Sequence, residues 1–144
     1  MLVVLSTITY FVIRTMSPRD SIALQQAERL RNDIRHAQML AMTWNQALRI
    51  TAVATSYSVS CVTAGVAPCN ASPVIDPAGR GPFLVGLEPG LSLAGPGFTL
   101  DIDALGRPMN GSSLITANAI YTISGGSAAR TVTVAPITGF VTAQ

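Results

Sequence analysis

The first half of the chain contains two segments with different patterns of apolar and charged residues. Residues 1–13 (MLVVLSTITYFVI) carry no charge, whereas Arg14 and Arg19 follow closely. As a helix, residues 1–13 would be about 20 Å long, against a bilayer core of about 30 Å. Taken alone the segment is short for a membrane span, and a buried helix or a signal-peptide core is the simpler interpretation. A signal peptide fits poorly, because no basic region precedes the apolar run.

From Pro18 onwards the pattern is that of an amphipathic helix. Proline is favoured in the first turn of a helix. Apolar residues then recur at alternating spacings of four and three, which places them on one face: Ala23, Ala27, Leu30, Ile34, Ala37, Ala41, Trp44 and Leu48. We expect a helix over residues 18–46 whose apolar face docks on the rest of the same chain, because the repeat is too short to require a coiled coil.

Beyond this helix the period changes to the alternation of β-strands. Short strands are predicted at residues 48–54, 57–61, 83–87, 91–93, 98–102, 120–124 and 130–134. A loop rich in proline and glycine is expected over residues 62–82. The last two strands flank a Ser-Gly-Gly-Ser-Ala-Ala segment that is typical of a hairpin. In residues 98–102 the alternation points Asp101 and the following Asp103 outward.

The order of elements predicts an α+β fold, with one long helix packed on a small antiparallel sheet or sandwich. Such a sheet has one apolar face that needs cover, and the apolar face of residues 18–46 supplies it. The expected division is an N-terminal helix over residues 1–46 and a β domain over residues 47–144. Residues 1–13 have no such surface in the β domain, so lipid or other helices are their expected environment.

Composition narrows the function classes. Of 144 residues, 49% are hydrophobic and 11% are charged, which excludes a disordered chain. The formal net charge is +2, and the basic residues are scattered, which argues against a protein that depends on nucleic acid. Arg80, Arg107 and Arg130 are the candidate contacts for DNA or another ligand if they converge in space; otherwise they are dispersed surface residues.

The residues give little support for catalysis or for a bound cofactor. His36 is the single histidine, no carboxylate is evident beside it, and no nucleophile motif is present. Asp101 and Asp103 are too few oxygen ligands for a calcium site without further acids. We therefore expect no enzyme activity, no metal and no cofactor. Cys61 and Cys69 can close a short loop as a disulfide in an oxidising compartment, or remain two free thiols.

Three stretches resemble the type IV pilin-like superfamily, and within it the GspH/FimT class of minor pilins and pseudopilins. They are LRNDIRHAQMLA (residues 30–41), FTLDIDALGRP (residues 98–108) and the closing segment of residues 124–139. Details of the helix resemble the mannose-sensitive haemagglutinin pilus branch. The apolar start, the amphipathic helix and the β domain follow the same order as in this family.

The resemblance implies a non-enzymatic structural subunit of a type IV pilus or a type II secretion filament, active in assembly or initiation. It implies a single-pass protein of the bacterial inner membrane with its β domain in the periplasm, which later joins a filament. Its partners would be membrane lipid and other pilin or pseudopilin subunits. The implied assembly residues are Leu2, Val3, Val4, Leu5, Ile8, Phe11, Val12 and Ile13. The alternative is a minor pilin whose β domain binds DNA for uptake, as some members do, or a surface ligand.

The start of the chain departs from the family pattern. Family members begin with a short basic leader that ends in glycine, followed by an aromatic residue or Met and then Thr-Leu-Ile-Glu. Here Met1-Leu-Val-Val resembles the stretch that follows that glutamate. We therefore expect further residues upstream of Met1. As written, the chain offers prepilin peptidase no cleavage site.

Overall fold

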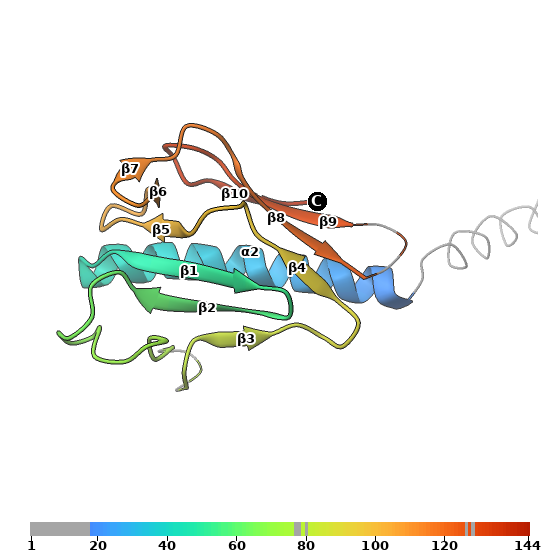
Figure 1. Ribbon diagram of the computed structural model, residues 1–144, viewed down its shortest axis with the longest axis horizontal. Helices are drawn as coiled ribbons and strands as arrows, with labels where there is room; N and C mark the ends of the chain where they lie inside the picture. The colour runs from blue at the N-terminus through green and yellow to red at the C-terminus, as the bar shows by residue number, and fades with distance from the viewer. Residues whose placement is uncertain (1–17, 77–78, 80, 126, 128) are drawn as a thin grey trace, which may run out of the picture.

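The computed structural model describes residues 18–144 except residues 77, 78, 80, 126 and 128. One helix, α2 (Pro18–Trp44), precedes the strands. Among the described residues the strands are β1 (Leu48–Val53), β2 (Ser56–Cys61), β3 (Leu84–Gly86), β4 (Ser92–Ala94), β5 (Leu100–Ile102), β6 (Pro108–Asn110), β7 (Ser113–Leu114), β8 (Ala119–Ser124), β9 (Arg130–Val134) and β10 (Val141–Ala143). This is the predicted α+β fold, with α2 lying behind the strands in Figure 1.

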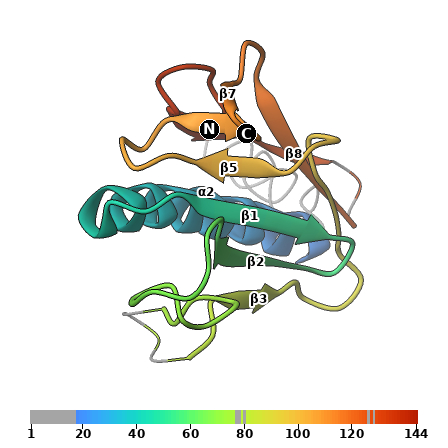
Figure 2. The same cartoon turned by 60° about the vertical axis from the view of Figure 1, so that its left-hand side comes forward.

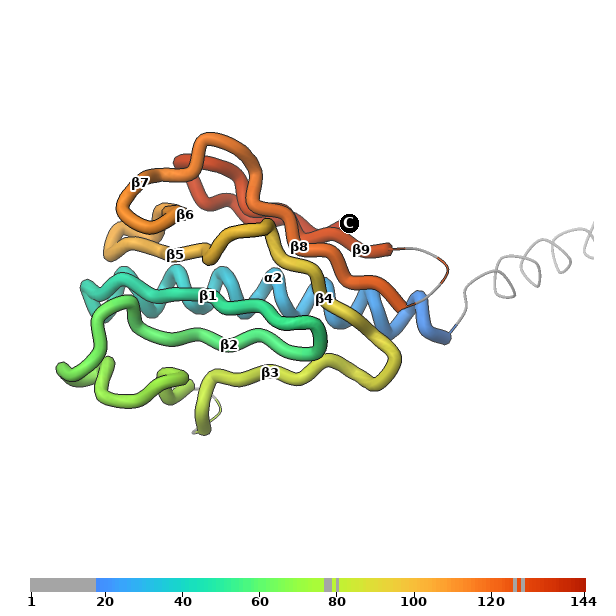
Figure 3. Tube along the Cα trace, viewed as in Figure 1, coloured from blue at the N-terminus to red at the C-terminus, as the bar shows by residue number. Residues whose placement is uncertain are grey.

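The strands form two antiparallel sheets. The first has the order β3-β2-β1-β5-β6-β7 and the second the order β10-β9-β8-β4. Each is built around a hairpin, β1–β2 in the first sheet and the predicted β8–β9 hairpin in the second. The sheets meet near the end of β1, where the Leu93 N–H donates to the Ala54 carbonyl at 2.9 Å. Figure 3 shows the chain passing from β4 in one sheet to β5 in the other, and Figure 2 shows α2 behind β1 of the first sheet.

The core lies between α2 and both sheets. The helix contacts β1 and β5 of the first sheet and β8, β9 and β10 of the second. Its buried apolar residues are Ala23, Ala27, Leu30, Ile34, Ala37, Leu40 and Ala41. Most of these belong to the predicted apolar face, and Trp44 packs against the core while partly exposed. The small alanine side chains allow the strands to approach the helix closely.

The helix ends at Trp44, two residues before the predicted end. Asn45 adopts φ 52°, the left-handed conformation that commonly stops a helix. The Gln46 N–H then donates back to the Ala41 carbonyl at 3.1 Å, which satisfies one of the last helical carbonyls. Gln46 therefore already belongs to the connection to β1.

One orientation predicted from the strand alternation is wrong. Asp101 was expected to face solvent, but all three residues of β5 are buried and Asp101 is only 3% exposed. Its partner across the β1–β5 ladder is Arg49, whose Nε and Nη2 donate to the two carboxylate oxygens at 2.7 and 2.9 Å. A bidentate arginine lets a carboxylate occupy a buried position of a sheet.

Within residues 18–144, apart from the undescribed positions, no helix has both the length and the apolar character needed to cross a bilayer. Residues 1–13, with the eight candidate assembly residues, lie outside the described part of the chain.

Candidate functional site

The start of α2 is joined to the β8–β9 turn through Asp20. This carboxylate is 4% exposed and accepts hydrogen bonds from the Ser127 N–H at 2.8 Å and the Ser127 hydroxyl at 2.7 Å. Asp20 also lies in the first turn of α2, where the helix dipole favours a negative charge. A buried charged acceptor with two donors therefore fixes the second sheet to the beginning of the helix.

The other end of α2 is joined to two glycine turns through Gln38. Its Nε2 donates to the Gly106 carbonyl at 3.2 Å and to the Gly139 carbonyl at 2.8 Å. Both glycines have positive φ, 79° and 67°, in the left-handed region that favours glycine. A neutral amide thus connects α2 to the β5–β6 turn and to the β9–β10 turn at once.

Exposed apolar side chains surround this second contact. We call the group the distal patch, and it consists of Met39 (53% exposed), Met42 (52%), Leu105 (68%), Ile137 (62%) and Phe140 (60%). The patch combines one flank of α2 with both of the turns that Gln38 holds.

Midway along α2, Asp33 contacts the first sheet. The hydroxyl of Tyr57 on β2 donates to Asp33 Oδ2 at 2.6 Å, and Arg29 Nε lies 3.9 Å from the same oxygen. Burial raises the pKa of Asp33 by more than the Tyr57 hydrogen bond and the Arg29 charge lower it. Burial and the Asp33 carboxylate together raise the pKa of Tyr57 well above its ordinary value. The tyrosine is therefore a hydrogen-bond donor at any physiological pH.

His36 has a carboxylate neighbour that the sequence did not reveal. Its Nε2 lies 3.4 Å from Asp76 Oδ1, and its ring centroid lies 5.9 Å from that of Phe83. Asp76 belongs to the loop that precedes β3, so no local sequence signal could have paired the two residues. This pair links α2 to the loop, and among the described residues no group of three potential metal ligands lies together.

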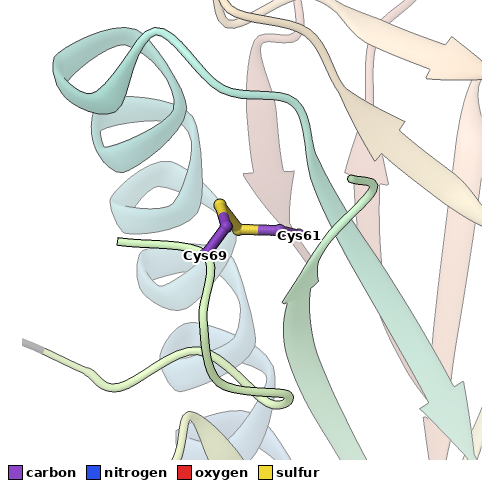
Figure 4. The surroundings of a disulfide bond; sticks show 2 residues. All are labelled: Cys61 and Cys69. Atoms are coloured by element: carbon purple, nitrogen blue, oxygen red, sulfur yellow. A yellow bond between two sulfur atoms is a disulfide. The ribbon is translucent and has the colours of Figure 1, made fainter. Parts of the chain in front are cut away.

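The two cysteines form a disulfide. Cys61 ends β2 and Cys69 lies in the following loop, with their Cα atoms 5.6 Å apart (Figure 4). The Gly65 N–H donates to the Cys69 carbonyl at 2.9 Å inside the closed loop. The bond therefore ties the start of the proline-rich loop to the first sheet.

The carboxylate of Asp103 forms an ion pair with Arg107. One oxygen accepts from the backbone N–H groups of Leu105 and Arg107, and the other lies 2.7 Å from the Arg107 guanidinium. Partial burial opposes ionisation, but these hydrogen bonds and the arginine charge outweigh it and lower the pKa of Asp103. The carboxylate organises the turn that also carries Leu105 and Gly106.

Two of the three candidate arginines, Arg107 and Arg130, lie near opposite ends of α2. Arg107 follows Gly106 near the end of α2, whereas Arg130 begins β9 shortly after Ser127, which contacts the start of α2. The helical contacts at the two ends, Asp20 and Gln38, are about 27 Å apart along the axis. Arg80 lies outside the described residues. Arg107 and Arg130 do not form the cluster of cations that a phosphate backbone requires.

A hollow of about 360 Å³ lies at the junction of the two sheets. It is lined mainly by β1 residues 50–52 and by residues 95–99, with Tyr121 at its wall, and it holds no charged side chain. Burial raises the pKa of Tyr121. The residues that line the hollow include no acid and base that could act together in general acid–base catalysis.

Comparison with known proteins gives a likeness in structure only. No protein-family model matches the chain, and no curated protein matches it in sequence. Two crystal structures of the type IV minor pilin FimU from Pseudomonas aeruginosa are similar. One has a TM-score of 0.58 and 15% identity, covering 84% of this chain and 87% of FimU. The other has a TM-score of 0.57 and 14% identity, covering 82% and 89%.

This likeness defines the class of fold. The chain has a type IV pilin-like fold, in which one N-terminal helix packs on antiparallel sheets. At such low identity the likeness extends to the fold alone. The GspH/FimT class and the mannose-sensitive haemagglutinin branch remain predictions from the sequence motifs.

Proposed function

We propose that the chain is a non-enzymatic structural subunit of a pilin-like filament, either a type IV pilus or a type II secretion filament. The observation that carries the proposal is the pilin-like fold of residues 18–144, shared with FimU over most of both chains. In this sequence the fold follows the uncharged segment of residues 1–13. The sequence motifs favour a minor subunit of the GspH/FimT class that acts in assembly or initiation.

The proposed mechanism is a transfer of the apolar segment between two apolar surroundings. Residues 1–13 would reside in the inner membrane before assembly. They would then pack among the corresponding segments of neighbouring subunits. The hydrophobic effect holds the segment in lipid but contributes little to its transfer into the filament, because lipid and packed helices are similarly apolar. Selectivity would come from the surfaces of α2 and of the β domain.

This proposal places the β domain in the periplasm. Disulfides form and persist in that oxidising compartment, and the Cys61–Cys69 bond supports the placement. A DNA-binding role is not proposed, because Arg107 is paired with Asp103 and lies at the opposite end of α2 from Arg130.

Substitution of Leu5 by Arg tests the proposed function. A charge near the middle of an apolar helix costs about 3 kcal/mol on insertion scales, so we expect the variant to be reduced at least tenfold in the sheared filament fraction, measured by immunoblotting. Leu5→Ile keeps the apolar character and should be incorporated normally. Leu84→Arg adds the same charge at an exposed position of β3 and should also be incorporated. Normal incorporation of Leu5→Arg would refute the role.

A further inference from the structure

We propose that the distal patch is a docking surface for the apolar N-terminal segment of a neighbouring subunit, the segment that residues 1–13 represent in this chain. The inference rests on the proposed function and adds to it the acceptor surface. It concerns one defined set of side chains, namely Met39, Met42, Leu105, Ile137 and Phe140.

The patch is contiguous because its three segments contact one another. A Cβ placed on Gly106 would lie 3.2 Å from Met42 Sδ, so the turn that carries Leu105 lies against the flank of α2. Gln38 holds the same turn and the β9–β10 turn together. The Arg35 guanidinium lies 5.6 Å from the centre of the Phe140 ring. Side chains distant in sequence therefore form one surface.

The surface is held in place rather than loosely exposed. Ile137 has φ 64°, a conformation that a β-branched residue rarely adopts, and its side chain still points to solvent. The turn around it is closed by hydrogen bonds between Ala135 N–H and the Phe140 carbonyl at 2.8 Å and between Gly139 N–H and the Ala135 carbonyl at 3.1 Å. Backbone strain that exposes an apolar side chain gives the isolated subunit no benefit, and such strain is typical of binding sites.

The charges around the patch favour an uncharged occupant. Arg35 is engaged by the Phe140 ring and donates to the Val141 carbonyl at 3.2 Å. Arg107 is engaged by Asp103. The two methionines add flexible, polarisable side chains that adapt to varied apolar partners. Exposed apolar clusters of this kind mark interaction sites, and an apolar segment without charges matches this one.

The length of the chain outside the described residues indicates where that segment comes from. Residues 1–17 precede the start of α2, whereas the distal patch surrounds its end. Helix α2 has 27 residues and is therefore about 40 Å long. A helix of residues 1–13 would be only about 20 Å long. Residues 14–17 add at most about 14 Å when extended, so a helical segment folded back along α2 would bring only its first few residues to the patch. We therefore assign the occupant to another subunit.

The positions of donor and acceptor also fix the type of assembly. The segment precedes the start of α2 in the sequence and the acceptor lies around the end of α2, so the two surfaces differ and their contact is heterologous, head to tail. Contacts of this type produce open filaments when the rotation between subunits does not close a ring. The distal patch thus gives the proposed filament subunit a polarity.

Photo-crosslinking in the assembled filament tests the docking surface. The full chain would be produced in its native cell with p-benzoylphenylalanine in place of Leu105, and adducts in the sheared filament fraction would be mapped by mass spectrometry. We expect adducts to residues 1–17 of a second copy or to the apolar start of another pilin-like subunit. The same probe at Leu84, which is 58% exposed on β3, is the control and should give few such adducts. Adducts from position 105 to lipid or strand surfaces alone, or none, would overturn the inference.

A paired substitution adds a readout that misfolding cannot imitate. Leu105→Gln with Phe140→Gln should lower filament incorporation at least fivefold, with an unchanged unfolding midpoint monitored by Trp44 fluorescence. The matched control, Leu84→Gln with Ile120→Gln, changes two other exposed apolar residues and should be incorporated normally. Equal incorporation of both double variants would overturn the inference. If Leu5→Arg is not incorporated into the filament but the Leu105/Phe140 double variant is, the proposed function stands and the docking surface is refuted. Normal incorporation of Leu5→Arg would refute both the proposed function and the docking surface.

Discussion

The two ends of α2 are attached to the β domain by different chemistry. At the start, a buried carboxylate, Asp20, accepts two hydrogen bonds from Ser127. At the end, the neutral Gln38 amide donates to two glycine turns, and large apolar side chains around it stay exposed. The comparison teaches that one helix can be fixed at both ends by different chemistry, with large apolar side chains left exposed around its end.

The difference follows from the cost of burying each group. A carboxylate withdrawn from water must keep its hydrogen bonds, so the Asp20 end tolerates little rearrangement. An uncharged amide loses less on desolvation, and glycine turns impose a shape without covering the residues beside them. The end of α2 can therefore present apolar side chains beside charges that are already engaged, Arg35 by the Phe140 ring and Arg107 by Asp103.

The largest expected effect comes from removing the Asp20 carboxylate, which attaches the start of α2 to Ser127. Asp20→Ala removes a charged acceptor of two hydrogen bonds and a favourable charge at the helix start, so the free energy of unfolding should fall by about 3 kcal/mol. Ser127→Ala removes one donor only and should cost about 1 kcal/mol. Urea unfolding of the full chain in detergent, followed by Trp44 fluorescence, measures both. Equal effects of the two substitutions would contradict the central role given to the carboxylate.

A smaller effect is expected from disturbing the contact of Gln38 with the two glycine turns. Gly139 has φ 67°, and a Cβ there would collide with Gln38 Nε2 and lie 3.0 Å from the Gly106 carbonyl oxygen. Gly139→Ala should therefore cost about 2 kcal/mol, from the left-handed backbone and from loss of the Gln38 contact. Gly106→Ala meets only the flexible Met42 side chain and should cost about 1 kcal/mol. If the same unfolding measurement reverses this order, the turns are not held as described.

The smallest expected effect is a dependence of stability on pH. It differs in sign between Asp103, in the turn beside the distal patch, and Asp33, midway along α2. The lowered pKa of Asp103 means that its stabilisation is complete above the ordinary value of 3.8 and is lost as the pH falls below it. The raised pKa of Asp33 has the opposite sign, since the cost of its ionisation appears as the pH rises above 3.8.

Two asparagine variants separate these contributions. Compared with wild type, Asp103→Asn should be destabilising by about 1 kcal/mol or less at pH 7, and the difference should shrink towards pH 3. For Asp33→Asn the free energy of unfolding, relative to wild type, should rise between pH 4 and pH 7. Urea titrations across pH 3 to 7 measure both trends. Parallel pH profiles for the two variants would contradict the assigned pKa directions.

Local patterns in the sequence were sufficient to predict the main elements. The spacing of Ala23, Leu30, Ile34 and Ala41 predicted the buried face of α2, because a helix repeats its faces every few residues. The alternation around Tyr57 and Val59 predicted β2, and the glycine-rich turn predicted the β8–β9 hairpin. Strands β6, β7 and β10, with two or three residues each, were not predicted.

Long-range pairs of polar residues were beyond such patterns. Asp101 reads as a solvent-facing residue of its strand until Arg49 is placed beside it by the β1–β5 pairing. Asp20 and Ser127 are 107 residues apart, and Gln38 and Gly139 are 101 apart. Nothing local distinguishes these residues from ordinary surface positions. The distal patch was missed for the same reason, since its members come together only when three segments meet.

The position of the second sheet in the chain has a consequence for biogenesis. Strands β8, β9 and β10 cover much of α2, yet they leave the ribosome well after it. Strands β1 and β5 emerge earlier and cover only the part of the helix that faces the first sheet. The apolar residues of α2 that face the second sheet therefore stay accessible during synthesis until β8–β10 arrive, and a chain cut short before β8 would leave them exposed.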